Sequence, residues 1–303
     1  MWTGFAFGEN DEGEFEMTTK EVPIPEAAKA AGMTTLVFED DFDSMDTIDI
    51  DATHQPGYKW YPDAYGHRLT RDYIYQKDSY IHIGGPQPSS YGLATYSNPL
   101  DAGFTVTCGC YMEARIRAGM PTGKYGGIPA FWTFKLADFK GERGWSEGGE
   151  LDVVELFITK NKDGKDQKYF CGTLHHHYRQ WTEDGKQERA YVSNLVNNCG
   201  YRDQFPFVDD DWHTYAALWQ KGHMAWYLDG QLMHSARYSP DALPEYYYRD
   251  DPTPLPRVHE VYPHVTKPER IGSHSIFDTD EGVVLLTSRE TYPMDVDWVR
   301  IWR

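Results

Sequence analysis

Short runs of alternating apolar and polar residues recur from Thr34 to the end of the chain, and Gly, Asp or Pro separates one run from the next. Many runs are rich in β-branched and aromatic residues, as in strands that bury one face. The pattern contains no long amphipathic helix and no alternation of strands with helices. It therefore predicts an all-β protein, a β-sandwich jelly roll of two antiparallel sheets. The predicted strands are 36–42, 78–84, 104–118, 127–136, 149–158, 169–177, 211–220, 224–236, 281–288 and 294–302.

Two local signals refine this prediction. Asp229-Gly230 stands between two apolar runs, which is a strong signal for a hairpin. Residues 25–32 predict one or two helical turns that end at Gly32. The rest of residues 1–33 is acidic and irregular, so we expect a peripheral N-terminal extension there and a single domain over 34–303.

Long connections are expected at 54–68, 85–97 and 239–265, and all three are rich in aromatic residues. Long ordered loops on a sandwich are usually functional or poorly ordered. The third connection, which is rich in Tyr, either packs against the domain or rims a binding site, and we favour packing.

Composition narrows the classes of partner. Aromatic residues make up 15% of the 303 residues, and flat rings beyond those needed in a core can form platforms for sugars. The chain has 29 Lys and Arg against 47 Asp and Glu, a net charge of −18, which argues against nucleic acid because a polyanion requires a basic surface. No run approaches the ~18 apolar residues of a membrane span, so no membrane insertion is expected.

Cysteine usage and the N-terminus bear on the compartment. Cys108 and Cys110 lie two apart on a predicted strand and cannot easily bridge each other, so buried free thiols are favoured, while a Cys171–Cys199 bridge stays open. The first residues lack the basic and apolar regions of a secretory signal. Two alternatives follow: an intracellular protein, or a secreted, cell-surface or periplasmic protein whose signal has been removed.

The most informative segment is Glu150-Leu151-Asp152-Val153-Val154-Glu155. Glu150 and Asp152 share one face of a regular strand, whereas Glu155 has the opposite parity. One extra residue, a β-bulge near Val153-Val154, would return Glu155 to the face of the other two. Three neighbouring carboxylates are unfavourable unless some are protonated, so their coupling should raise at least one pKa.

Two carboxylates on one surface suit hydrolysis of a glycosidic bond with retention. One attacks the anomeric carbon, and the other first protonates the leaving oxygen and then deprotonates water. The alternative is an exposed strand with acidic residues outward. Gly148-Gly149 permits close approach of a ligand, and Trp132 and Trp145 precede the segment where they could stack on sugar rings, which favours the catalytic interpretation.

The string from Glu150 to Glu155 resembles the active-site signature of family 16 glycoside hydrolases in its bulged form. Further segments resemble markers of that family in the right order, and the resemblance covers about residues 34–303. These segments are 36–43, 111–116, 129–132, 212–215, 226–230 and 293–300.

The resemblance implies a jelly roll with a concave face that holds an extended polysaccharide. It implies Glu150 as nucleophile, Glu155 as acid/base and Asp152 as the residue that positions and tunes the nucleophile. It also implies substrate contacts from Trp132, Trp145 and His175. No cofactor is required, although some members carry a structural calcium on the convex side through an aspartate like Asp297. The run His175-His176-His177 does not favour a metal, because consecutive strand residues alternate faces.

We therefore expect an endo-acting retaining hydrolase that acts as a monomer on internal β-linkages of a polysaccharide, with β-1,3- or mixed β-1,3/1,4-glucan as the first candidate. A β-galactan such as agar, porphyran or a host glycan is the alternative; the net charge argues against heavy sulfation unless a patch such as Arg68 and Arg71 offsets it. A carbohydrate-binding protein without turnover is the alternative from another class, and the intact carboxylates count against it. Transglycosylation also stays open, because a sugar can capture the covalent intermediate.

Overall fold

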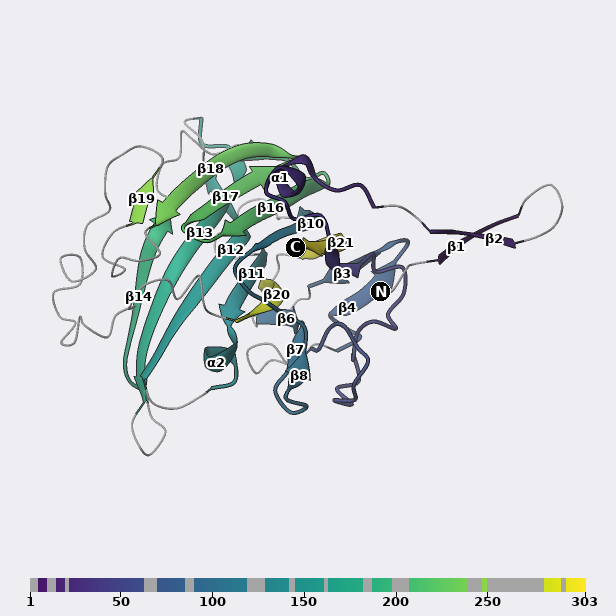
Figure 1. Cartoon of the computed structure of the whole chain (residues 1–303), viewed down its shortest axis with the longest axis horizontal. Coiled ribbons are helices and arrows are strands. Elements are labelled where there is room, and N and C mark those ends of the chain that lie inside the picture. Colours follow the sequence, from purple (N-terminus) through teal and green to yellow (C-terminus); the bar gives the residue numbers. More distant parts are fainter. Residues whose placement is uncertain are drawn as a thin grey trace.

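The computed structural model describes residues 22–62, 70–84, 90–118, 129–141, 145–160, 163–181, 187–197, 207–238, 281–289 and 293–303, together with short strands at 5–9, 15–19 and 247–249. Two large antiparallel sheets make up most of this structure and lie face to face (Figure 1). The predicted β-sandwich is therefore confirmed.

The first sheet, called the β10 sheet, has the strand order β19-β18-β17-β16-β10-β21-β5-β4, and β3 pairs with β21 off this path. Its strands are β3 (Leu36–Asp40), β4 (Ile74–Lys77), β5 (Tyr80–Ile83), β10 (Cys110–Ala118), β16 (His213–Gln220), β17 (His223–Leu228), β18 (Gln231–Tyr238), β19 (Tyr247–Arg249) and β21 (Met294–Trp302).

The second sheet, called the β12 sheet, has the order β14-β13-β12-β11-β20-β6, with β15 beside β13 and β9 beside β20. Its strands are β6 (Ser90–Ala94), β9 (Thr105–Val106), β11 (Ala130–Lys135), β12 (Trp145–Lys160), β13 (Asp166–Trp181), β14 (Gln187–Asn197), β15 (Phe207–Val208) and β20 (Gly282–Arg289). The remaining elements are the strand pairs β1 (Phe5–Glu9) with β2 (Phe15–Thr19) and β7 (Tyr96–Ser97) with β8 (Ala102–Gly103), and the short helices α1 (Glu26–Ala30) and α2 (Leu136–Phe139).

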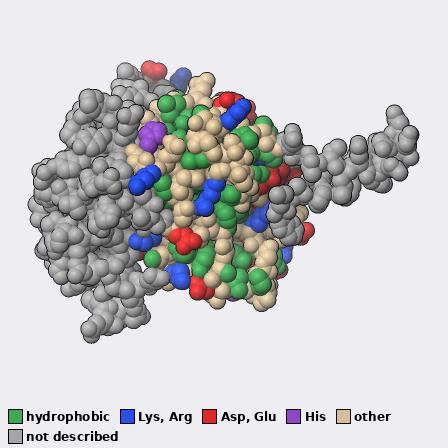
Figure 2. All heavy atoms as spheres, viewed as in Figure 1, with side chains coloured by type: hydrophobic (Ala, Val, Ile, Leu, Met, Phe, Trp, Pro, Cys, Tyr) green, Lys and Arg blue, Asp and Glu red, His purple; other side chains and the backbone are tan. Residues whose placement is uncertain are grey.

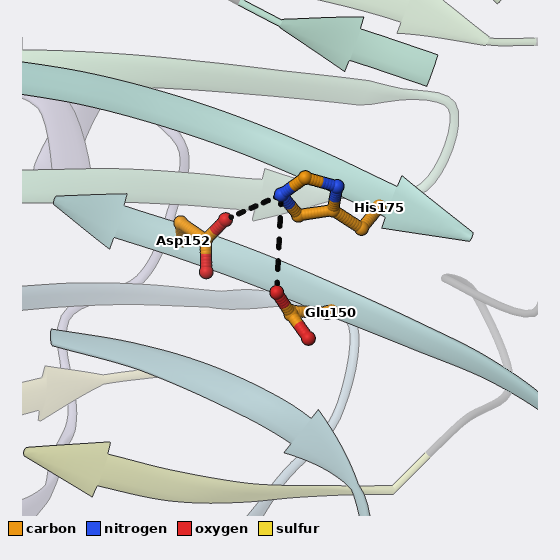
Figure 3. Close-up of side chains that lie close together, drawn as sticks. All are labelled: Glu150, Asp152 and His175. Carbon is orange, nitrogen blue, oxygen red and sulfur yellow. Dashed lines mark ion pairs between the residues drawn. The ribbon is translucent and has the colours of Figure 1, made fainter. Parts of the chain in front are cut away.

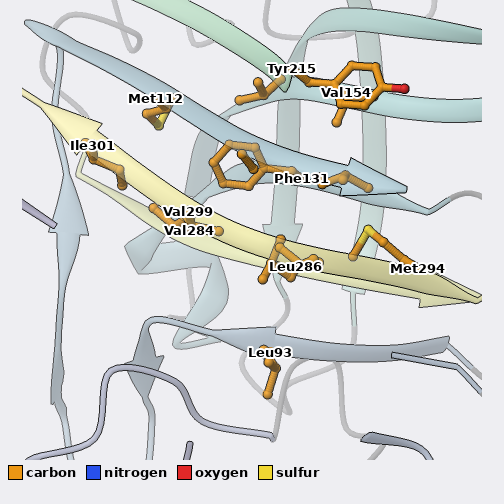
Figure 4. Packing of buried hydrophobic residues seen from close by; sticks show 14 of the residues in the cluster. Leu93, Met112, Phe131, Val154, Tyr215, Val284, Leu286, Met294, Val299 and Ile301 are labelled. Atoms are coloured by element: carbon orange, nitrogen blue, oxygen red, sulfur yellow. The ribbon is translucent and has the colours of Figure 1, made fainter. Parts of the chain in front are cut away.

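The hydrophobic core lies between the two sheets, where each strand contributes every second side chain. Along β21, for example, Met294, Val296, Val299 and Ile301 are fully buried. Figure 4 shows side chains from both sheets meeting in this layer, among them Leu93, Met112, Phe131, Val154, Tyr215, Val284 and Leu286. This layer supports the inner side of β12.

Both local signals in the sequence are confirmed. Asp229 and Gly230 have φ values of 49° and 76° and join β17 to β18, which agrees with the left-handed pair of a tight hairpin turn. The predicted helical turn is α1, and Gly32 follows it with φ 78°. Ala28 and Met33 pack in an apolar cluster with Tyr111, Ala216, Leu218, Ala225 and Trp302 on the β10 sheet.

Several strands go beyond the sequence prediction. The expected connection 85–97 contains β6 and β7, and β4 and β14 were not predicted. Strand β6 forms at the edge of the sheet because its residues pair with β20, a long-range partner that composition does not reveal. The connection 54–68 is described only up to residue 62, and within 239–265 only the backbone of β19 is described.

The favoured interpretation of Cys108 and Cys110 as buried thiols is confirmed only in part. Neither residue is disulfide-bonded; Cys110 is buried, which raises its pKa to about 12, whereas Cys108 is only half-buried. Cys171 is disulfide-bonded. Its predicted partner, Cys199, lies outside the described residues.

The described surface is mixed in chemistry. On the face seen in Figure 2, charged side chains of both signs are scattered among apolar and uncharged ones. Among the described residues, no helix has the length and apolar character that crossing a membrane requires.

Candidate active site

The predicted bulge is present in β12, at the predicted residues. On β13, Asp152 lies opposite Thr173 and Glu155 lies opposite Cys171, so Val153 and Val154 together face one residue. On the other side, β11 shows the same shift, since Phe131 lies opposite Val154 and Trp132 lies opposite Asp152. Both valines are fully buried in the core. The extra residue therefore brings Glu155 to the face of Glu150 and Asp152.

This surface, called the carboxylate face, is the side of the β12 sheet that bears Glu150, Asp152 and Glu155. Directly opposite residues of antiparallel strands share a face. The register therefore adds three side chains from β11 and three from β13. They are Ala130, Trp132, Phe134, Cys171, Thr173 and His175.

Asp152 is the most deeply placed of the three acids, with 2% of the residue exposed. Burial, followed by the nearby charge of Glu150, raises the pKa of Asp152 well above its usual value. The two carboxyls also interact electrostatically, since the charge of Asp152 raises the pKa of Glu155. This coupling disfavours the state in which both are ionised.

Glu155 has the electrostatics of a general acid. Burial and then the charge of Asp152 raise the pKa of Glu155 to about 8, although His175 and the hydroxyl of Thr173 favour its ionised form. Thr173 Oγ1 donates a hydrogen bond to Glu155 Oε2 at 3.3 Å. Near neutral pH Glu155 therefore holds a proton that it can transfer.

His175 lies beside the other two carboxylates, as predicted. Its Nε2 is 3.1 Å from Asp152 Oδ2 and 3.8 Å from Glu150 Oε1. Figure 3 shows the imidazole from β13 facing both acids from the neighbouring strand. With 17% of its side chain exposed, Glu150 is the more accessible of the two acids. The exposed carboxylate is therefore placed to meet a substrate, while Asp152 lies behind it.

Trp132 lies on the carboxylate face, where a sugar platform was predicted. Its indole Nε1 donates to Thr287 Oγ1 at 3.0 Å, and its ring is 5.8 Å from that of Phe134. Trp132 packs at the edge of an apolar cluster formed by Ala94, Tyr96, Phe134, Val283 and Leu285. The ring orientation is thus fixed by a hydrogen bond and by neighbouring apolar groups.

The structure does not support a predicted role for Trp145 or for Asp297 in the way that it places Trp132. Trp145 begins β12, but its side chain lies outside the described residues, so its role as a platform stays a prediction. Asp297 accepts a hydrogen bond from Arg115 Nη1. A guanidinium at this carboxylate does not favour calcium, which needs six to eight oxygen ligands.

The carboxylate face also contains the group of potential metal ligands found in the described part of the chain. Glu150, Asp152 and His175 each offer one atom, all within 4.8 Å of one another. Metal ligands must be deprotonated. A cation there would therefore compete with protonation of Asp152, whose raised pKa favours the neutral acid.

Thr173 is a residue that sequence reasoning missed. The register of β13 against β12 puts Thr173 opposite Asp152, and its hydroxyl donates a hydrogen bond to Glu155. The only signal in the sequence was its position two residues before His175 on the same predicted strand, which puts both side chains on one face.

The fold and this site define a β-sandwich protein with three neighbouring acids on one face of a bulged strand. The model of the family "Glycosyl hydrolases family 16" matches residues 94–259, more than half of the chain, and the chain belongs to this family. The family predicted from the sequence is thus confirmed.

Individual relatives are more distant. The chain is 27% identical over 124 residues to a beta-glucanase from Rhodothermus marinus, covering 41% of this chain and 37% of the relative. It is 31% identical over 121 residues to a glucan endo-1,3-beta-glucosidase from Cryptopygus antarcticus, covering 40% and 37%. The matches therefore span well under half the length of these relatives. Among solved structures, the catalytic domain of an endo-1,3-beta-glucanase (laminarinase) from Thermotoga petrophila has a TM-score of 0.47 at 15% identity, over 89% of this chain and 97% of that one.

Proposed function

We propose that this chain is an endo-acting retaining glycoside hydrolase of β-1,3- or mixed β-1,3/1,4-glucan. The observation that carries the proposal is the pairing of a protonated Glu155, with its pKa raised to about 8, and a more exposed Glu150 on one face of a bulged strand. Both relatives described above are named as glucanases or glucosidases of β-glucan, which supports the choice of substrate.

The reaction uses the acids in two steps. Glu150 attacks the anomeric carbon while Glu155 transfers its proton to the leaving oxygen. This step gives a covalent glycosyl-enzyme and releases the part of the polysaccharide on the leaving-group side. Glu155, now ionised, then takes a proton from water, and the resulting hydroxide displaces Glu150 with net retention. Asp152 and His175 position Glu150, because His175 Nε2 contacts both acids.

A polysaccharide panel tests this function. The purified chain is incubated with laminarin, mixed-linkage glucan, agarose and porphyran, and new reducing ends and product sizes are measured. We expect reducing ends from one or both glucans, with a rapid fall in polymer size that marks internal cleavage, and β-anomers as the first products by ¹H NMR. If reducing ends appear only with a galactan, the substrate is a β-galactan and not a β-glucan. If the protein binds a polysaccharide but releases no reducing ends, it is a carbohydrate-binding protein and not an enzyme.

The other attributes follow from the same proposal. We propose that the chain acts as a monomer and requires no cofactor, with a secreted, cell-surface or periplasmic location as one alternative and an intracellular one as the other. Calcium at Asp297 is tested by melting the protein with EDTA and with added Ca²⁺. A higher melting temperature in Ca²⁺ that Asp297→Asn abolishes would support the site, whereas identical curves would remove it.

A further inference from the structure

The chemistry proposed above depends on the bulge, because only the extra residue turns Glu155 toward Glu150. A bulge interrupts the regular ladder of hydrogen bonds and leaves backbone groups to be satisfied elsewhere. The interior contact at this point is therefore part of what fixes the geometry of the acid.

Trp226 makes that contact from the opposite sheet. It lies in β17, is 1% exposed, and its indole Nε1 donates a hydrogen bond of 2.8 Å to the backbone oxygen of Asp152, the residue at which the bulge begins. The bond crosses the interior and joins the β10 sheet to the β12 sheet, and Figure 1 shows these two sheets face to face.

Gly172 provides the space for this indole. It is the single residue on β13 that faces Val153 and Val154. A Cβ on Gly172 would lie 2.2 Å from Trp226 Cδ1, 2.5 Å from Nε1 and 2.6 Å from Cγ. Contacts this close are not tolerated, so the ring lies directly against the backbone opposite the bulge.

The indole of Trp226 also packs against its neighbouring strands, β16 and β18. The ring of His234 in β18 stacks on it at 5.8 Å between centroids and 29° between planes. Ala217 lies opposite Trp226 on β16 and is fully buried. One tightly packed side chain therefore touches both strands of the bulge.

We propose that Trp226 is a positioning residue for the acid/base, and that its ring and indole N–H, seated against Gly172, lock the bulge that aims Glu155 at the substrate. Residues on either side of Gly172 reach the same acid: Thr173 donates to Glu155, and Cys171 lies opposite it. A shift of β13 against β12 at this point would therefore displace Glu155 from the hydroxyl of Thr173. The inference rests on the proposed hydrolase activity.

The test replaces the indole while retaining apolar volume. In Trp226→Phe the N–H is lost, and we expect kcat to fall roughly ten-fold or more with KM changed less than about two-fold, because small displacements of a reacting group cost up to ~10²-fold in rate. The basic limb of the pH–activity profile should also move, since it reports the proton on Glu155. Gly172→Ala should act in the same way, and the two substitutions together should be less than additive because they break one contact.

Trp219 offers a matched control. It is a tryptophan of the same core, 3% exposed, and its indole Nε1 has no hydrogen-bond partner among the described residues. Trp219→Phe should lower the melting temperature as Trp226→Phe does, but leave kcat and the pH profile unchanged. Equal kcat values and pH profiles for wild type, Trp226→Phe and Gly172→Ala would overturn the proposal.

Two further measurements keep the inference testable by itself. If Trp226→Phe does not fold, benzothienylalanine at position 226 preserves the bicyclic shape and removes only the N–H, with the same expected loss of kcat. If the wild type cleaves no β-glucan, the proposed function is rejected while the positioning role of Trp226 can still be tested. A ¹³C NMR titration of the Glu155 carboxyl then decides the inference: its midpoint should shift in Trp226→Phe but not in Trp219→Phe, and coincident midpoints in all three proteins would refute it.

Discussion

At the scale of single residues, burial rather than residue type distinguishes the two glutamates proposed as catalytic. Glu155 is a protonated acid because it is buried and lies beside Asp152, which raises its pKa to about 8. Glu150 lies on the same strand, but its side chain remains 17% exposed and contacts the imidazole of His175. These two environments, five positions apart, therefore suit the opposite roles proposed for the two glutamates.

The role of Glu150 is tested by Glu150→Gln. An amide of the same shape cannot form the glycosyl-enzyme, so we expect kcat to fall by several orders of magnitude. The melting temperature should change little, because Glu150 is only partly buried. Turnover close to that of the wild type would remove Glu150 as nucleophile.

The role of Glu155 is tested by Glu155→Ala with two kinds of substrate. Formation of the intermediate should be slowed strongly for a natural glycan but less for an aryl glycoside whose leaving group needs no proton. Azide should restore the second step, because it attacks without a general base, and the glycosyl azide should be detected by mass spectrometry. Equal losses for both substrates, with no azide product, would contradict the assignment.

The pH profile tests the coupling between Asp152 and Glu155. Because Glu155 must be protonated, kcat/KM of the wild type should fall as the pH rises through about 8, the pKa of that carboxyl. The charge of Asp152 raises this pKa. In Asp152→Asn the basic limb should therefore move to lower pH. A limb unmoved in this variant would show that Asp152 does not set the proton affinity of Glu155.

At the scale of elements, the site was more predictable than its surroundings. The parity of Glu155 predicted a bulge at Val153-Val154, and Asp229-Gly230 predicted the hairpin, because both signals lie within a few consecutive residues. Strand β6 and the longer reach of β12 and β13 depend on pairing partners far along the chain. For the same reason no local pattern revealed that Trp226 contacts Asp152 across the core.

The outer face of β10 contains another buried acid, Glu113, whose titration has a testable effect on stability. Glu113 is 6% exposed between Ala216 and Arg300, and its Oε1 accepts a hydrogen bond from Trp302 Nε1 at 3.2 Å. Burial raises its pKa from 4.5 to about 7, although Trp302 and Arg300 favour the ionised form. Between pH 4.5 and about 7, Glu113 therefore keeps its proton in the folded state but loses it in the unfolded chain.

The sign of the pH effect follows from this shift. Because the folded pKa is the higher one, the stability that Glu113 contributes is complete below pH 4.5 and is lost as the pH rises through about 7. Glu113→Gln retains an acceptor for Trp302 and removes the titration. We measure the free energy of unfolding of both proteins by urea denaturation and take the variant's value minus that of the wild type. This difference should be larger at pH 8 than at pH 4.5 by roughly 2–3 kcal/mol, because the variant is relatively more stable at high pH. An equal difference at both pH values would exclude this titration.

At the scale of the whole molecule, a chain with net charge −18 places three of its acids on one face of a sheet. The raised pKa values of Asp152 and Glu155 favour retention of a proton by this pair, which reduces the local charge. Beside them lies Trp132, which is only partly buried and whose ring can pack on an uncharged sugar, whereas Phe134 and Thr173 are buried. This surface suits a neutral polymer better than a sulfated one, whose charges would be repelled.

Salt dependence turns this argument into a measurement. Binding of a neutral glucan involves no ion pair, so the dissociation constant of catalytically inactive Glu150→Gln for laminarin should change by less than about two-fold between roughly 0.05 and 0.5 M NaCl. A sulfated galactan held by arginines would bind more weakly as salt rises. The described Arg71 already pairs with Asp51, and Arg68 lies outside the described residues. Isothermal titration with laminarin and porphyran at both salt concentrations distinguishes the substrates. Tight, strongly salt-dependent binding of porphyran alone would place arginines at the site and reject the glucan.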